Sequence, residues 1–167
     1  IDGVAQVISV VPGVKLLHVD SGKAANRTVY TFVGFPDSVI DAAFALFEYV
    51  IQHVDMEKHV GTHPRVGAVD VCPLIPIQGI SMEQTKQYAE KLAKRVGEEL
   101  HVPIYFYEHN AKYIHRTRLE QIRSGEYEGF KQKILLEGWE PDYGPQSFNP
   151  KTGVSVIGAR NYLLAFN

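Results

Sequence analysis

The sequence lacks several features that would place it in a familiar class. Its 167 residues include one cysteine, Cys72, which excludes an intramolecular disulfide and favours a reducing compartment such as the cytoplasm. No apolar run approaches the ~20 residues that span a bilayer, and no basic segment followed by an apolar one opens the chain. The 17 basic residues nearly balance the 19 acidic ones, so nothing indicates a general nucleic-acid binder. We therefore expect a soluble, untargeted, cytoplasmic protein.

Well-known catalytic and cofactor motifs are also absent from the sequence. There is no GxxxxGK[ST] phosphate loop, no GxGxxG dinucleotide fingerprint, no HExxH zinc motif and no GxSxG nucleophile elbow. The hydrophobic content of 45% is high enough for a chain of this length to bury one core. The sequence therefore predicts one folded domain and indicates no nucleotide cofactor.

Helical and strand-like patterns alternate along the chain, which predicts an α/β protein of the α+β type, with a mixed β-sheet covered by helices. Ser81 and Gln84 match a capping box and mark the start of the clearest helix. Asp37 follows a proline and is the expected cap of an earlier one. Pro73 and Pro76 place their strand at a sheet edge. The predicted helices cover 1–11, 37–54 and 81–100, and the predicted strands cover 15–20, 28–33, 69–77, 103–107, 154–157 and 163–166.

The segment HVGTHPRVGAVDVCPLIPI, residues 59–77, places a histidine on a stiffened turn. Pro64 biases His63 toward extended backbone angles, and the flanking glycines let the backbone approach a ligand. Arg65 adds a fixed positive charge. An unperturbed imidazole titrates near ~6.5, which makes His63 the candidate for acid/base chemistry. The alternative is a surface histidine hydrogen-bonded to its own turn.

His59 and His63 stand four residues apart, which is also the helical spacing of a two-histidine metal site with Asp55 as a third ligand. Gly61 and Pro64 disfavour the regular helix that this spacing requires, and no cysteine cluster accompanies the pair. The sequence therefore favours no metal site.

Three other parts of the sequence contain candidates for binding. Asp20 ends a predicted strand, where it either faces a ligand or bonds the backbone of its own turn. Asn26 and Arg27 begin the next strand, and an arginine there can hold a carboxylate through two parallel hydrogen bonds. The irregular loop 142–153 is either a plain connection or a surface on which Phe148 grips a planar ring.

Three ordered blocks of the sequence resemble one enzyme family. The blocks are NRTVYTFVG at 26–34, DMEKHVGTHPRVGAVDVCPLIPI at 55–77, and GPQSFNPKTG at 144–153 with VIGARNYLLAFN at 156–167. Over nearly its whole length the chain resembles the N-terminal subdomain of glutamate formiminotransferase, the transferase half of formiminotransferase-cyclodeaminase. The resemblance implies transfer of the formimino group from N-formiminoglutamate to N5 of tetrahydrofolate, releasing glutamate in histidine degradation and one-carbon metabolism. It implies tetrahydrofolate as co-substrate, no metal, and a homodimer in the full enzyme.

The resemblance also implies roles for individual residues. His63 falls on the family's catalytic histidine, and Asp20 falls on an active-site aspartate that either stabilises the cationic formamidinium or orients His63. The basic stretch 112–123 suits carboxylates of the substrates, although a solvated face is the more common outcome. The folate-contacting loop falls on Gly144, Pro145, Gln146, Ser147, Phe148, Asn149, Pro150, Lys151, Thr152 and Gly153. The substrate-binding candidates, taken from their positions alone, are Asn26, Arg27 and Arg65.

The chain departs from the family pattern at both ends. The family's subdomain begins with a strand that precedes the position of Ile1, and a second, C-terminal subdomain follows the position of Asn167, with the folate site between the two. We therefore expect 1–167 to be the N-terminal subdomain without its first strand. Two alternatives remain at this stage: a non-catalytic, stand-alone subdomain that binds folate or a partner, and a related formyl transfer from N-formylglutamate.

Overall fold

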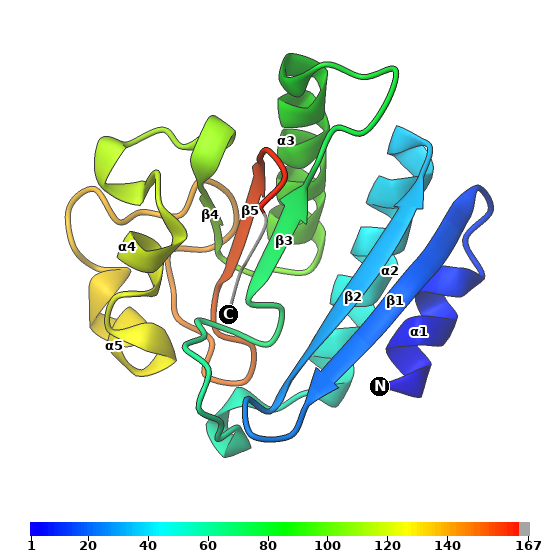
Figure 1. Ribbon diagram of the computed structural model, residues 1–167. Coiled ribbons are helices and arrows are strands. Elements are labelled where there is room, and N and C mark those ends of the chain that lie inside the picture. The colour runs from blue at the N-terminus through cyan, green and yellow to red at the C-terminus, as the bar shows by residue number, and fades with distance from the viewer. Residues whose placement is uncertain (164–167) are drawn as a thin grey trace.

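The computed structural model describes residues 1–163, which form two groups of strands backed by helices (Figure 1). Strands β1 (Val14–Gly22) and β2 (Arg27–Gly34) form an antiparallel hairpin. Strands β3 (Val71–Leu74), β5 (Ser155–Ala159) and β4 (Ile104–Phe106) form a parallel sheet in that order. The α/β class is confirmed, with the strands divided between these two hydrogen-bonded sheets. As predicted, β3 lies at an edge of its sheet, and it ends before Pro76.

The helices begin close to their predicted positions, with one difference in capping. Ser81 Oγ accepts a hydrogen bond from Gln84 N at 3.2 Å and Gln84 Oε1 accepts one from Ser81 N at 2.9 Å, which confirms the capping box. Asp37 is not a cap, because its helix starts one residue earlier, at a proline whose missing N–H costs nothing in a first turn. The Asp37 carboxylate instead pairs with Lys91, 2.6 Å away. The helices are α1 (Asp2–Ser9), α2 (Pro36–His53), α3 (Met82–Glu99), α4 (Leu119–Arg123) and α5 (Glu126–Lys133), and the 3-10 turns are η1 (Met56–Lys58), η2 (Glu108–Asn110) and η3 (Ile114–Arg116).

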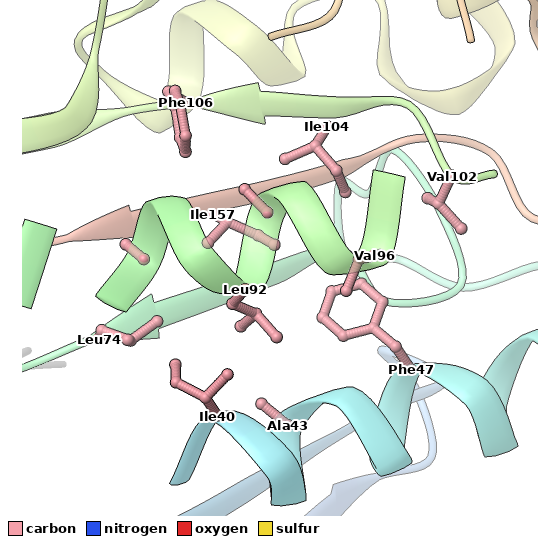
Figure 2. Packing of buried hydrophobic residues seen from close by; sticks show 12 residues of the cluster. Ile40, Ala43, Phe47, Leu74, Leu92, Val96, Val102, Ile104, Phe106 and Ile157 are labelled. Atoms are coloured by element: carbon pink, nitrogen blue, oxygen red, sulfur yellow. The ribbon is translucent and has the colours of Figure 1, made fainter. Parts of the chain in front are cut away.

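Strand β5 is the centre of the molecule, and all of its residues are buried. Because successive side chains of a strand point to opposite faces, Ile157 packs toward α3 and Val156 packs toward α4 and α5. Figure 2 shows the first of these layers, in which Phe47 of α2 lies beside Val96 of α3, in one cluster with Ile157 of the sheet. The second layer contains Tyr105, Tyr107, Ile122 and Phe130. The parallel sheet is therefore covered on both faces.

The hairpin differs from the parallel sheet because only one of its faces is covered. Helices α1 and α2 pack on the face that carries Tyr30 and Phe32. On the other face, Asp20 lies opposite Val29, and Arg27 lies opposite Gly22 at the end of the hairpin. All four of these residues are exposed. The hairpin therefore presents Asp20 and Arg27 on one open face.

The last predicted strand, 163–166, falls almost wholly outside the described residues, and Leu163 itself is not in a strand. Within residues 1–163, no helix has both the length and the apolar character needed to cross a membrane.

Candidate functional site

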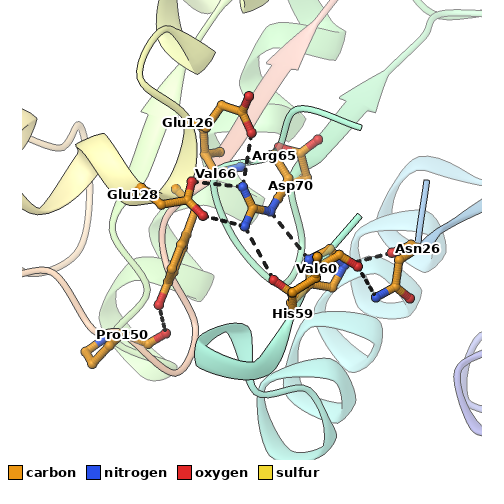
Figure 3. Close-up of polar contacts among 10 residues, drawn as sticks. Asn26, His59, Val60, Arg65, Val66, Asp70, Glu126, Glu128 and Pro150 are labelled. Atoms are coloured by element: carbon orange, nitrogen blue, oxygen red, sulfur yellow. Dashed lines mark hydrogen bonds and ion pairs between the residues drawn. The ribbon is translucent and has the colours of Figure 1, made fainter. Parts of the chain in front are cut away.

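His63 lies on the irregular segment between η1 and β3, and this segment is hydrogen-bonded to the turn of the hairpin. Asn26 Nδ2 donates a hydrogen bond to Val60 O at 2.8 Å (Figure 3). Thr62 N and Thr62 Oγ1 both donate to Ala24 O, at 3.0 and 3.1 Å. Two segments that are separated in sequence therefore behave as one rigid support for His63.

His59 uses both of its ring nitrogens to hold this support together. Its Nε2 lies 2.8 Å from Asn26 O, so Nε2 carries the proton and donates to the carbonyl. Its Nδ1 accepts a hydrogen bond from Arg65 Nε at 3.4 Å. Asp55 is paired with Lys58 at 2.8 Å. No group of three or more histidine, cysteine, aspartate or glutamate side chains suited to a metal is found in the part of the chain that the structure describes.

His63 is half-buried, and its Nε2 lies 2.8 Å from Arg27 Nη1. Burial and the charges of Arg27 and Arg123 lower the pKa of His63 below its usual 6.5. The charges of Asp70 and Glu126 act in the opposite direction, with smaller effect. The ring is therefore neutral at neutral pH, and a neutral imidazole is a base.

Arg65 has its charge satisfied within the protein. Its largely buried guanidinium lies 3.0 Å from Glu126 Oε2 and 2.7 Å from Glu128 Oε1, both at the start of α5 (Figure 3). Arg65 in turn lowers the pKa of Glu128, because its hydrogen bond favours the ionised carboxylate. These groups lie in a depression of about 460 Å³ whose lining also includes His59, Val60, Gly61 and Gly125.

The predicted solvated face over 112–123 is wrong for two of its arginines. Arg116 is completely buried and donates to Glu140 O at 2.8 Å and to Asp142 Oδ1 at 3.2 Å. Arg123 is paired with Asp70, which also accepts a hydrogen bond from Val66 N at 3.0 Å. A buried arginine needs such partners because an uncompensated charge is costly to remove from water.

The segment 144–153 is an irregular loop, as predicted, and the structure joins it to the segment that carries His63. Gly67 and Gly153 form an antiparallel bridge. On either side of it, Ala68 N donates to Thr152 O at 2.8 Å and Val154 N donates to Val66 O at 3.0 Å. The structure therefore brings the predicted histidine segment and the predicted folate loop together on one frame.

The members of this loop differ in exposure and hence in what they can do. Thr152 and Gly153 are buried and support the backbone bridge. Phe148 is half-buried, and its ring lies 5.2 Å from that of Tyr127, whose hydroxyl donates to Pro150 O at 2.5 Å. Pro145 is also half-buried. The exposed members are Gly144, Gln146, Ser147, Asn149, Pro150 and Lys151, of which Gln146 also donates to Ile134 O at 3.2 Å and Asn149 Oδ1 accepts from Lys151 N at 3.0 Å.

The site is assembled at an unusual end of the parallel sheet. The His63 segment leads into β3, and the loop 144–153 leads into β5, so both lie at the amino ends of their strands. Ligands of open parallel sheets more often bind at the carboxyl ends. Asp20 lies on the same open hairpin face as Arg27, the residue that contacts His63, and no hydrogen bond or ion pair engages its carboxylate within residues 1–163.

Comparison with known proteins identifies the architecture. The family model described as "Formiminotransferase domain, N-terminal subdomain" matches residues 1–160. The chain belongs to this family. It is 48% identical over all 167 residues to formimidoyltransferase-cyclodeaminase of Rattus norvegicus, covering 31% of that protein. It is 42% identical over 167 residues to glutamate formimidoyltransferase of Streptococcus pyogenes serotype M1, covering 56% of that protein. The chain thus spans between about a third and just over half of these relatives.

Sequence reasoning missed several charged residues that surround the His63 segment. Asp70, Arg123, Glu126 and Glu128 surround the His63 segment through ion pairs that join positions 53 to 63 residues apart. No local pattern marks them, since each charge is recognisable as part of the site only from the position of its partner. The acidic pair could have been suspected only from its place at a helix start, where carboxylates are favoured.

The bridge between the two loops depends on the absence of a side chain at Gly67, where an added Cβ would lie 2.1 Å from Val154 O. We expect Gly67→Ala to lower the free energy of unfolding by about 1–3 kcal/mol, because backbone must move to admit the methyl group. Gly129→Ala is the matched control: a Cβ there meets nothing within 4 Å. In a helix that change stabilises by roughly 0.5–1 kcal/mol. Urea unfolding that ranks the two variants equally would contradict this account of the bridge.

The ion pair between Arg65 and Glu128 predicts a pH-dependent contribution to stability. Because the pKa of Glu128 is lowered on folding, the pair stabilises above the ordinary carboxyl pKa of 4.5 and is lost as pH falls through the folded-state value. We expect Glu128→Gln to lower the free energy of unfolding by roughly 0.5–1 kcal/mol near neutral pH. The loss should be smaller at acidic pH, where the carboxylate of the wild type becomes protonated. Glu90→Gln, at an exposed position of α3, is the control. Urea titrations at several pH values measure both, and a pH-independent loss would contradict the assignment.

Proposed function

We propose that the chain supplies the acid/base part of a glutamate formiminotransferase, which transfers the formimino group of N-formiminoglutamate to N5 of tetrahydrofolate. The observation that carries the proposal is a half-buried His63 that contacts Arg27 of the open hairpin face, on a segment that the Gly67–Gly153 bridge joins to the loop 144–153. The names of the relatives support formimino transfer in general. Since these relatives are longer than the chain, the proposed activity belongs to the full-length protein.

The proposed reaction needs one group that first accepts a proton and then returns it. N5 of tetrahydrofolate attacks the amidine carbon, forming an N5–C bond and a tetrahedral centre, and His63 takes the proton that N5 loses. The bond between that carbon and the glutamate nitrogen then breaks, and His63 returns the proton to the departing amine. Atoms balance without an oxidant or a further reactant. General acid/base catalysis by one residue typically contributes ~10²- to 10⁴-fold in rate.

We assign Asp20 to charge stabilisation rather than to orienting His63. In the described part of the chain, the ring nitrogen contact of His63 is to Arg27, and no contact joins it to Asp20. Asp20 shares the open hairpin face with Arg27, and its exposed carboxylate is free to face a cationic formamidinium. A carboxylate near a developing positive charge stabilises it.

We assign the folate surface to the exposed residues of the loop between Gly144 and Lys151. Phe148, held by Tyr127, keeps this surface in place from beneath. Thr152 and Gly153 act indirectly, through the bridge to Gly67. The proposal includes a cytoplasmic role in histidine degradation and one-carbon metabolism, in line with the donor and acceptor named above.

We expect His63→Ala to lower kcat/KM for formimino transfer by ~10²- to 10⁴-fold in the full-length protein. In the wild type, the acidic limb of the pH profile of kcat/KM should lie below pH 6.5, because the lowered pKa keeps the imidazole unprotonated to lower pH. His53→Gln, at the exposed end of α2, serves as control. Unchanged turnover in His63→Ala would reject the mechanism. Running the assay with N-formylglutamate beside N-formiminoglutamate identifies the donor.

The exposed loop predicts a separate effect on folate. We expect Lys151→Met to raise KM for tetrahydrofolate roughly tenfold, since a hydrogen bond to a charged group contributes ~1.5–3 kcal/mol, while kcat stays near that of the wild type. Lys131→Met, at an exposed position of α5, is the charge-matched control. Equal KM values for the two variants would remove Lys151 from the folate surface. A protein that binds tetrahydrofolate but transfers nothing would be a binding module.

A further inference from the structure

In the contact between Arg27 and His63, the donor and the acceptor can be assigned from the chemistry of the two groups. Arg27 Nη1 lies 2.8 Å from His63 Nε2. A guanidinium carries donors only, so Nε2 must offer its lone pair, and the proton of the neutral ring must sit on Nδ1. The nitrogen held by Arg27 is therefore the only basic atom of His63. While the contact is closed, this atom cannot accept a proton from a substrate.

Arg27 also differs from the other arginines around the site in having no carboxylate partner. Arg65 is paired with Glu126 and Glu128, and Arg123 is paired with Asp70. No carboxylate within residues 1–163 lies in ion-pair contact with Arg27, whose partner is the neutral imidazole. Its side chain is exposed at the start of β2, on the open hairpin face. An arginine in this state suits a carboxylate brought by a ligand, since its fork matches that group.

We propose that Arg27 is a positioning residue that exchanges partners. In the empty site it holds Nε2 of His63 unprotonated, and on substrate binding it moves to a glutamyl carboxylate, which frees Nε2 to act as the base. The inference rests on the proposed function, because glutamyl carboxylates are carried by both the amino-acid donor and folate. Nε2 of His63 therefore becomes available as a base only when the substrate is bound.

The charges facing His63 suit both halves of the proton cycle. In the closed state, burial and the charges of Arg27 and Arg123 disfavour the imidazolium, and Asp70 and Glu126 favour it with smaller effect. A carboxylate that neutralises Arg27 offsets the larger of the two opposing charges, which makes it easier for Nε2 to take the proton from N5 as the N5–C bond forms. Departure of the glutamate as the C–N bond breaks requires that proton on its amine. Product release then returns Arg27 to Nε2.

The test follows His63 by long-range 1H–15N NMR of the full-length protein labelled with [15N]histidine. In the wild type above the His63 pKa, we expect an unprotonated Nε2 and a protonated Nδ1. Arg27→Met should raise the pKa of His63 and mix the two tautomers, whereas Arg27→Lys, which keeps a charged donor, should restore the wild-type pattern. Lys23→Met removes an exposed charge from the same hairpin turn and should leave His63 unchanged. A protonated Nε2 in the wild type, or equal effects of Arg27→Met and Lys23→Met, would overturn the inference.

A ligand series identifies the carboxylate. In one arm, N-formiminoglutamate or glutamate is added alone; in the other, tetrahydrofolate is added alone. We expect the Nε2 resonance to shift in one of these arms and not in the other. In the assay, Arg27→Met should raise KM for that source roughly tenfold or more and move the acidic limb of kcat/KM upward, because a charge-assisted pair is lost. Arg27→Lys should restore the limb but not KM, since an ammonium lacks the bidentate fork.

The outcomes separate this inference from the proposed function. No Nε2 shift with either ligand, in a protein that transfers the formimino group, would reject the exchange and leave the function standing. A protein without formimino transfer, in which Arg27 still holds Nε2 and a glutamyl ligand still releases it, would reject the proposed function and retain the exchange.

Discussion

The close approach of two backbones at Gly67 and Gly153 is the constraint on which the rest of the site depends. At Gly153, where φ is +67°, an added Cβ would lie 2.4 Å from Val66 O, so neither strand of this bridge tolerates a side chain. The bridge fixes the start of β5, the buried central strand, and it fixes the loop 144–153 against the segment that carries His63. A packed core alone would leave both loops free, because loops on a protein surface are otherwise held by few contacts.

Of the three arginines around the bridged loops, two are paired with carboxylates of the protein and one is not. Arg65 and Arg123 are held by carboxylates of the protein, and their pairing joins α4 and α5 to the frame. Arg27 has an imidazole as its partner instead. A pair formed between a permanent cation and a neutral base is weaker than an ion pair, and it is therefore the one contact of the three that a ligand anion can displace at low cost.

The sequence predicts the local features of this protein well and its long-range pairings poorly. The capping box at Ser81, the edge position of β3 and the irregular loop before β5 follow from propensity, proline geometry and turn residues, all of which act over a few positions. The buried role of Arg116 does not follow from them, since its partner Asp142 lies 26 residues away. The family resemblance selected His63 and the loop, but it did not reveal that Arg65 is already paired. Whether a charged side chain has a partner depends on residues that only folding brings close to it.

The half-buried position of His63 beside the open hairpin face suits the acid/base role that we propose for it. In the core, loss of water would hold the imidazole neutral at every useful pH and keep it from any substrate. On a fully solvated surface, the neighbouring charges would be screened and would have little control over its protonation. At the half-buried rim, those charges act through a partly dry medium, and a ligand that covers Arg27 and Asp20 removes more water. Each electrostatic contact then becomes stronger, so in the proposed mechanism the open hairpin face is the means by which substrate binding changes the basicity of His63.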